Sequence, residues 1–234
     1  MSNLIRLETL DVNGDVRQAA EDAGLDRKSF FRNSAVAGAG FVAGGVLFSG
    51  LTSPAMAQST ISKTKSVAND AKIGNYALTL EYLEAAFYKA ALAAGIIQDA
   101  RVLKFAQVVA QHEADHVAAL KKLLGKAAVK SPSFDFSSAL GTEASFKTTS
   151  QALEDTGVAA YAGQAPYIKQ LAVARPALGI HSVEARHAAW IRFLNGGGEP
   201  NAAAGATPAP NVVDAPLGQK TVLGAVGKLG FIKG

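Results

Sequence analysis

The sequence contains no cysteine. Disulfide bonds, zinc sites held by thiolates and catalysis by a cysteine nucleophile are therefore excluded. Any metal ion that the protein binds must be held by carboxylate or imidazole groups, because these are the remaining strong side-chain ligands. The lack of cysteine does not identify a cellular compartment, since an exported protein does not need a disulfide.

Clusters of basic residues are also rare. The chain has a formal net charge of +4 and a pI near 9.2, but Lys121-Lys122 is the one notable basic doublet beyond the N-terminal region. Proteins that bind nucleic acids usually concentrate Lys and Arg on one face, with aromatic residues between them. We therefore expect no nucleic-acid partner. A content of 49% hydrophobic and 18% charged residues is typical of a globular protein with a substantial core.

Charged residues are absent altogether from positions 33–62. This stretch follows the basic segment Arg27-Lys28-Ser29-Phe30-Phe31-Arg32, begins with an apolar run rich in Gly and Ala, and contains Ala55-Met56-Ala57. The order of basic segment, apolar run and small-residue cleavage site is that of an export signal. We interpret residues 1–57 as a signal that is cleaved after Ala57, followed by a linker at 58–66. The protein is then expected in the periplasm, the cell envelope or the extracellular space.

Two alternatives for this N-terminal region stay open. The basic segment is similar to a twin-arginine translocation signal, but lysine occupies the second basic position, so the general secretion route is an alternative. The region could also stay attached as a membrane anchor. A membrane span needs about 20 strongly apolar residues, whereas this run is shorter and diluted with glycine. Contact with a membrane is therefore expected only through an uncleaved signal.

Four helical segments are predicted in the rest of the chain. They cover residues 67–94, 99–124, 142–163 and 176–194, and Gly95, Gly125 and Gly196 follow three of them. The fourth is expected to begin near Pro176, since proline is accepted in a first helical turn. The first two segments and the last two are joined by short connections, but a longer non-helical link around 131–137 separates the pairs. This pattern predicts an all-α four-helix bundle over 67–195, made of two helical hairpins with a crossover link.

A tail follows the predicted bundle at residues 196–234. Its first part, to about residue 218, is rich in Pro, Ala and Gly and is expected to be extended. Its last part carries apolar residues at Val222, Leu223, Val226, Leu229, Phe231 and Ile232. We interpret that part as a short element that docks on the bundle, or alternatively contacts a partner.

Two copies of one motif carry the candidate chemistry. The second predicted helix contains Glu113-Ala114-Asp115-His116, and the fourth contains Glu184-Ala185-Arg186-His187. In each copy, a carboxylate and an imidazole three residues apart project from one helix face. A single Glu-x-x-His is usually a surface pair. Here each copy has a matching glutamate in the preceding helix, because Glu81 lies 32 residues before Glu113 and Glu154 lies 30 residues before Glu184.

These spacings bring the glutamates of each hairpin to one height. The midpoint between Glu81 and Glu113 is Ile97, in the first short connection, and the midpoint of the other pair is Lys169, in the second. Equal numbers of residues up one helix and down the next place two side chains level with each other. Docking of the hairpins is then expected to gather six side chains: Glu81, Glu113, His116, Glu154, Glu184 and His187.

All six residues lie on apolar helix faces. Four ionised carboxylates in a core are strongly destabilising unless they are paired. Two divalent cations would balance four negative charges. Ligation rich in carboxylates, with one nitrogen for each metal, suits iron or manganese. The expected cofactor is therefore two iron or two manganese ions, and the sequence does not choose between them.

Residues 75–88 and 181–190 resemble the ferritin-like superfamily, and more narrowly the bacterial ferritin-like domain proteins related to plant desiccation-related proteins. The resemblance extends over about residues 67–195, and Asp214-Ala215-Pro216-Leu217 is also similar to the narrower group. It implies a ferritin-like four-helix bundle in which the Glu-x-x-His glutamates, Glu113 and Glu184, bridge the two metals. It further implies that Glu81 and Glu154 are terminal ligands and that each histidine binds one metal.

Residues near the motifs are candidates for supporting roles: Glu84, Tyr88, His112, Tyr161 and His181. Glu84 lies one turn from Glu81 and is an alternative ligand. Glu81 is preferred because Tyr88 follows it by seven residues, as Tyr161 follows Glu154. Core packing is the favoured role for the two tyrosines, with support of the ligands or electron donation as alternatives. The two histidines are expected beside the ligands or on the surface.

The expected function is the handling of oxidants or metal ions under stress by an exported protein, with oxygen or peroxide as reaction partners. An oxidoreductase with two metals, of the ferroxidase or manganese-catalase kind, is one form of this function. The alternative is a non-catalytic structural or desiccation-protective envelope protein that uses the bundle as a scaffold. Fold and site do not fix the reaction, and the electron donor and a homodimeric state stay open.

Overall fold

A computed structural model describes residues 60–199 and 207–233 of the 234-residue chain. The predicted export signal at residues 1–57 lies outside the described residues. Within the described part of the chain, no helix combines the length and the apolar character that a membrane span requires.

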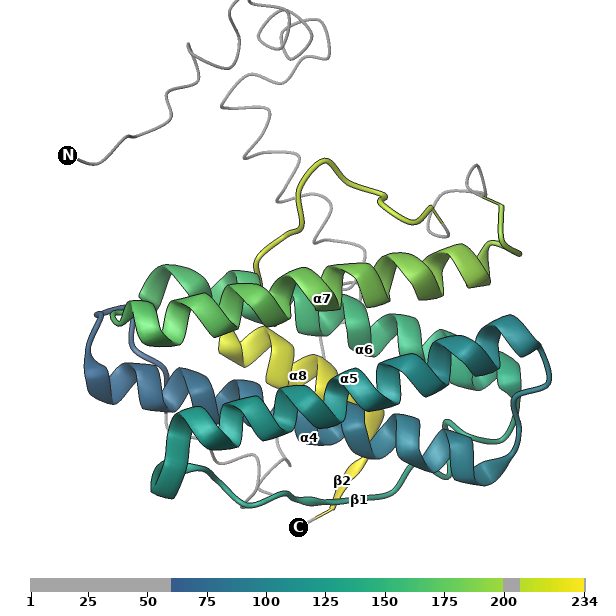
Figure 1. Cartoon of the computed structure of the whole chain (residues 1–234), viewed down its shortest axis with the longest axis horizontal. Helices are drawn as coiled ribbons and strands as arrows, with labels where there is room; N and C mark the ends of the chain where they lie inside the picture. Colours follow the sequence, from purple (N-terminus) through teal and green to yellow (C-terminus); the bar gives the residue numbers. More distant parts are fainter. Residues whose placement is uncertain (1–59, 200–206, 234) are drawn as a thin grey trace, which may run out of the picture. The chain divides into compact units, whose positions relative to one another are not determined.

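Four long helices lie side by side (Figure 1): α4 (Val67–Ala94), α5 (Ala100–Leu124), α6 (Glu143–Gln164) and α7 (Leu171–Asn195). Helix α4 packs mainly against α5, and α6 packs mainly against α7. The short turns η2 (Gly125–Ala127) and η3 (Ala165–Tyr167) follow α5 and α6. The structure therefore confirms the predicted all-α bundle of two hairpins.

Several helix ends follow from local sequence. The Ser66 hydroxyl caps α4 by accepting a hydrogen bond from the Asn69 N–H at 3.0 Å. Thr142 and Ser145 form a reciprocal capping box at the start of α6. Gly95 ends α4 with φ = 63°, a left-handed conformation that glycine adopts without strain. These signals lie next to one another in the chain, so the sequence predicts them well.

The start of α7 differs from the prediction. The helix begins at Leu171 rather than near Pro176, which lies inside it. Gln170 provides no side-chain cap. Instead Asp70, buried in the first turn of α4, accepts hydrogen bonds from the backbone N–H groups of Lys169 at 2.8 Å and Gln170 at 3.0 Å. The N-terminus of α7 is thus stabilised by a carboxylate from the other hairpin.

The start of α5 is held in the same way. Glu143, the first residue of α6, accepts hydrogen bonds from the backbone N–H groups of Gln98 at 2.5 Å and Asp99 at 2.8 Å. The first helix of each hairpin therefore caps the second helix of the other. These contacts set the height of one hairpin against the other.

The C-terminal segment packs against the bundle. Its helix α8 (Gln219–Leu229) contacts α6 and buries Val222 and Val226. Just before it, the Leu217 N–H donates to the Ala159 carbonyl at 3.0 Å. A Cβ atom at Gly163 would lie 1.9 Å from the Leu217 carbonyl oxygen, so this close passage needs glycine. After α8, the strand β2 (Ile232–Lys233) pairs antiparallel with β1 (Ser133–Phe134) in the crossover link.

The core consists of two apolar clusters. The larger one contains the aromatic residues Phe87, Tyr88, Phe105, Phe146 and Phe231. The smaller one contains Ala77, Leu78, Leu120, Tyr161 and Ile180. Along each long helix, the predicted metal-binding glutamate lies between residues of the two clusters. Apolar side chains therefore close the polar centre from both ends.

Candidate metal centre

The four long helices bring all six predicted ligands together. Helices α4 and α6 contribute Glu81 and Glu154, while α5 and α7 each contribute one Glu-x-x-His pair. The four glutamates are at most 1% exposed, and His116 and His187 are also buried. Potential ligand atoms lie within 4.8 Å of one another in two overlapping groups: Glu81, Glu113, His116 and Glu184 in one, and Glu113, Glu154, Glu184 and His187 in the other.

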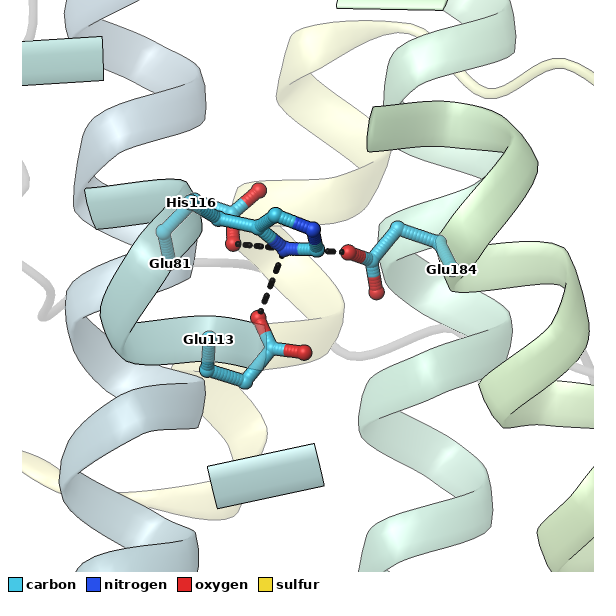
Figure 2. Close-up of side chains that lie close together, drawn as sticks. All are labelled: Glu81, Glu113, His116 and Glu184. Atoms are coloured by element: carbon cyan, nitrogen blue, oxygen red, sulfur yellow. Dashed lines mark hydrogen bonds and ion pairs between the residues drawn. The ribbon is translucent and has the colours of Figure 1, made fainter. Parts of the chain in front are cut away.

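We call the first group the His116 half of the centre. Its imidazole points into a ring of carboxylates (Figure 2). The distances from His116 Nδ1 are 3.2 Å to Glu81 Oε2, 3.3 Å to Glu113 Oε2 and 3.0 Å to Glu184 Oε1. One nitrogen and three carboxylate oxygens thus face a common point.

We call the second group the His187 half. His187 Nδ1 lies 3.1 Å from Glu113 Oε1, 3.3 Å from Glu154 Oε2 and 3.7 Å from Glu184 Oε2. Both halves therefore use Nδ1 of the histidine and three carboxylate oxygens. Because Glu113 and Glu184 occur in both, four glutamates provide six oxygens to the two imidazoles.

The two shared glutamates divide their oxygens between the halves. Glu113 directs Oε2 to His116 and Oε1 to His187, and Glu184 directs Oε1 to His116 and Oε2 to His187. Glu81 and Glu154 each face only one imidazole. The arrangement contains two carboxylates that span both halves and one carboxylate that belongs to each half alone.

Two buried tyrosines bind the outer oxygens of the unshared glutamates. The Tyr161 hydroxyl donates to Glu81 Oε1 at 2.5 Å, and the Tyr88 hydroxyl donates to Glu154 Oε1. Burial and the neighbouring glutamate raise the pKa of each phenol well above its usual value, so both remain protonated donors. Core packing, the role favoured by the sequence, is therefore only part of what the two tyrosines do, because each also holds a glutamate of the centre. In the sequence, each tyrosine follows the glutamate of its own helix by seven residues, and this spacing pointed to the centre. In the structure, each tyrosine instead donates to the unshared glutamate of the opposite hairpin.

Most of the inward-facing atoms of the centre lack hydrogen-bond partners among the described residues. They are Glu81 Oε2, Glu113 Oε1, Glu154 Oε2, both oxygens of Glu184, and His187 Nδ1. Such atoms are rare in protein interiors, because an unsatisfied buried polar group is destabilising. Each of these atoms faces one of the two common points. This donor set fits metal ions, which would satisfy carboxylate oxygens and imidazole nitrogens together.

Protonation explains how the centre is balanced without metal. Burial opposes a charged imidazole, but contacts with the surrounding carboxylates raise the pKa of both His116 and His187 to about 12. Burial raises the pKa of Glu154 to about 8, and burial together with Glu184 and Glu113 raises the pKa of Glu81 well above its usual value. Burial acts in the same direction on Glu113, but His116 and His187 outweigh it and lower its pKa to about 2. Protons therefore supply positive charge where metal ions would.

Glu84 is a fifth buried carboxylate at the centre. It is 4% exposed, but it belongs to neither group of potential ligand atoms, in contrast to Glu81. Its pKa is raised well above the usual value by burial and then by Glu184 and Glu113. A Cβ atom at Gly157 of α6 would lie 3.3 Å from Glu84 Oε1. The Glu84 carboxylate thus occupies space that Gly157 leaves open.

The two remaining histidines have different positions. His112 is exposed, and its Nδ1 lies 2.9 Å from His187 Nε2, with the two ring planes inclined by 18°. Burial, followed by the neighbouring His187 and His116, lowers the pKa of His112. His181 is only partly buried, and its Nδ1 has no hydrogen-bond partner among the described residues. His112 therefore contacts a residue of the centre, and His181 is outside the ligand groups.

Comparison with known protein families finds a match over the bundle. The family model described as a ferritin-like domain matches residues 69–197, which is more than half of the chain. The matched range contains the four long helices almost completely and all six residues of the two groups. A comparison with curated proteins finds no match.

Proposed function

Because this chain belongs to the ferritin-like family, we propose that it is an exported protein that binds two iron or two manganese ions and handles oxidants or metal ions under stress. The observation that supports metal binding most directly is the set of buried, inward-facing oxygens and nitrogen that lack hydrogen-bond partners among the described residues. A core that contains such atoms is stable only if protons or cations compensate them.

Each residue of the centre has a role in this proposal. Glu113 and Glu184 would each offer one oxygen to either ion, since each directs one oxygen to either half. Glu81 and Glu154 would each hold a single ion, and His116 and His187 would each offer Nδ1 to one ion. Four carboxylates then balance two divalent ions. One imidazole and several carboxylates for each ion suit iron or manganese better than softer metals.

Two such ions, when bound, supply electron exchange with dioxygen or peroxide. The protein's own residues exclude bulk water, because the apolar clusters lie at both ends of the centre. Tyr88 and Tyr161 hold the outer oxygens of Glu154 and Glu81, which orients the inner oxygens. Both phenols are also close enough to the centre to serve as electron donors in the proposed chemistry.

Export is the part of the proposal that depends on sequence alone. It is supported by the basic segment before residue 33, the uncharged stretch at 33–62 and the small residues at Ala55-Met56-Ala57. Mass spectrometry of the protein from separated cell fractions tests it. We expect a mature chain that begins at Gln58 in an exported fraction. An intact N-terminus in the membrane fraction would instead support an anchored protein.

Metal content tests the central part of the proposal. Elemental analysis of the purified protein should give about two iron or manganese ions per chain, and the Glu113→Ala/His116→Ala variant should lose them. Asp115→Ala is a matched control, because Asp115 is an exposed carboxylate on the same helix. Consumption of oxygen or peroxide by the loaded protein, absent in the double variant, would support an enzymatic role. A protein that binds no metal after anaerobic reconstitution would contradict the proposal and favour the structural alternative.

A further inference from the structure

Lysines gather at one end of the bundle, where α4 and α7 begin and α5 ends (the left end in Figure 1). We call it the lysine-rich end and define it as residues 60–75, 117–130 and 165–178. Its basic residues are Lys63, Lys65, Lys72, Lys121, Lys122, Lys126, Lys130, Lys169 and Arg175. All of these are exposed except Lys72, which is half-buried. The same segments contain a single acidic residue, Asp70. This end therefore has a strong excess of positive charge.

Hydrogen bonds join the three segments of the lysine-rich end. The Asn75 side chain donates to the Ala127 carbonyl at 2.9 Å and accepts from the Val129 N–H at 2.8 Å, which ties α4 to the residues that follow α5. Asp70 accepts from the Lys169 N–H at 2.8 Å, which ties α4 to the start of α7. Because Asp70 is buried in this contact, its carboxylate does not lie among the lysines on the surface.

The basic residues of this end form no ion pairs among the described residues. The lysines and arginines that do form ion pairs in the described part of the chain belong to the pairs Arg101–Asp99, Arg192–Asp155 and Lys233–Asp135. The opposite end of the bundle, at residues 88–104 and 142–147, has four basic and two acidic residues. Like charges that have no partners repel one another, so an anionic surface would bind at the lysine-rich end in preference to the opposite end.

Large apolar side chains are exposed at the same end. Of the large hydrophobic residues that are exposed in the described part of the chain, those at the lysine-rich end are Val67, Leu123, Leu171 and Leu178. Val67 and Leu171 are the first residues of α4 and α7, so they lie at the tip of the bundle, and Leu171 is 70% exposed. Exposed apolar side chains among lysines are typical of proteins that lie on a membrane surface.

Other partners fit this end less well. A second copy of the chain, docked by the same end, would bring two positive surfaces together. Proteins that bind nucleic acids favour arginine and interleaved aromatic residues, whereas all but one of the basic residues here are lysines. A lysine ammonium group is a point charge on a flexible stem, which suits a diffuse anionic surface better than the paired recognition of single phosphates. Clusters of basic residues bind anionic lipid bilayers without a defined pocket.

We propose that the lysine-rich end docks on an anionic phospholipid bilayer. Its ammonium groups lie among the lipid headgroups, and Val67 and Leu171 reach the boundary with the acyl chains. The sequence predicted membrane contact only through an uncleaved signal, but this contact belongs to the folded bundle and needs no signal. Val67 and Glu81 are separated by about 20 Å of helix, so docking leaves the candidate metal centre away from the headgroups. The inference does not depend on metal binding.

Flotation of the full-length protein with lipid vesicles tests the proposal. The anionic vesicles contain phosphatidylcholine with about one third phosphatidylglycerol, and the neutral vesicles contain phosphatidylcholine alone. We expect stronger binding to the anionic vesicles, and we expect a salt concentration of about 1 M to remove the difference, because salt screens exposed charges. Equal binding to both kinds of vesicle, or no binding to the anionic ones, would overturn the proposal. Binding to soluble heparin but not to vesicles would overturn it in favour of an acidic polymer.

Two variants with the same change in net charge locate the contact. Lys122→Glu/Lys126→Glu reverses two exposed charges at the lysine-rich end, and Lys89→Glu/Lys104→Glu reverses two at the opposite end. Each lysine near an anionic bilayer strengthens binding by about fivefold. We therefore expect the first variant to bind the anionic vesicles at least about tenfold more weakly, and the second to bind like the unchanged protein. Any binding through the N-terminal region is the same in both variants. Equal affinities of the two variants would overturn the proposal.

Leu171→Ala tests the apolar part of the contact. Val212→Ala is its matched control, because Val212 is also highly exposed but lies in the segment before α8. Truncation of a side chain that enters the bilayer boundary should weaken binding by about fivefold, and the control should bind like the unchanged protein. Thermal unfolding followed by circular dichroism checks that each variant is folded. Equal affinities of the two folded variants would contradict the insertion of Leu171, whatever the metal content of the protein.

Discussion

The His116 and His187 halves of the centre have the same ligand types but different surroundings. Each has one histidine, one glutamate of its own and two shared glutamates, and a tyrosine from the opposite hairpin holds the unshared glutamate. The two halves differ in that His112 Nδ1 contacts Nε2 of His187, and a fifth buried carboxylate, Glu84, lies next to Gly157 of α6. The comparison teaches that the repeated spacing sets the geometry of the potential ligands, while single unmatched residues give the two halves different surroundings.

The largest effect is expected from removing a glutamate that both halves share. Glu184→Ala deprives each position of one oxygen, so the metal content should fall from about two ions per chain towards none. Glu154→Ala affects only the His187 half and should leave about one ion. Elemental analysis of both variants measures the difference. Equal losses in the two variants would mean that the halves do not share their carboxylates as the oxygen distances indicate.

A smaller but still large effect is expected from pH. The pKa values of His116 and His187 are raised to about 12 in the metal-free centre. Both imidazoles therefore hold a proton at neutral pH, and each bound ion must displace at least one. The affinity for Mn²⁺ should rise by about tenfold for each pH unit and each proton released, which is about 100-fold between pH 6 and pH 8. Titrations at these two pH values test this, and equal affinities would contradict it.

The tyrosines should distinguish the two halves with effects of about tenfold. Tyr88→Phe removes the hydrogen bond to Glu154 and should weaken metal binding in the His187 half, whereas Tyr161→Phe should weaken it in the His116 half. Both substitutions preserve the ring and its packing. Anomalous diffraction from Mn²⁺-loaded crystals of each variant shows which half loses its ion. Loss of the ion from the same half in both variants would contradict the crossed arrangement.

The smallest effects are expected at the ends of the bundle. Asp70→Ala removes the cap of α7, and Glu143→Ala removes the cap of α5, so each should lower the free energy of unfolding by about 1–2 kcal/mol. The loss should be larger for Asp70, which is buried. Urea unfolding measures it. Metal content should stay at the level of the unchanged protein, and a coupled loss of metal would show that these caps also position the ligands.

Much of the fold could be predicted from the sequence because its signals are local. The ends of α4 follow from Ser66 and Gly95, which lie beside the helix that they limit. The start of α7 could not be read in this way, since its cap is Asp70, about a hundred residues earlier in the chain. The pairing of Ser133 with Lys233 was missed for the same reason, because two-residue strands have no pattern of their own.

In the candidate metal centre, too, the features set by a single helix could be predicted and those set by contacts between helices could not. The equal spacing of the Glu and Glu-x-x-His residues predicted that the six side chains meet, since helix geometry alone sets their heights. The direction of Glu84 depends on how α4 is rotated against α6 and on the space left by Gly157. The crossed hydrogen bonds of Tyr88 and Tyr161 depend on the antiparallel approach of the two hairpins. Neither property is encoded in the spacing along one helix.

The central claim is that the six side chains hold two metal ions, and anomalous X-ray diffraction from crystals loaded with Mn²⁺ tests it most directly. The account predicts two anomalous peaks, one beside Nδ1 of His116 and one beside Nδ1 of His187, with Glu113 and Glu184 in contact with both. The absence of a peak among these side chains, or peaks found only elsewhere on the protein, would contradict it.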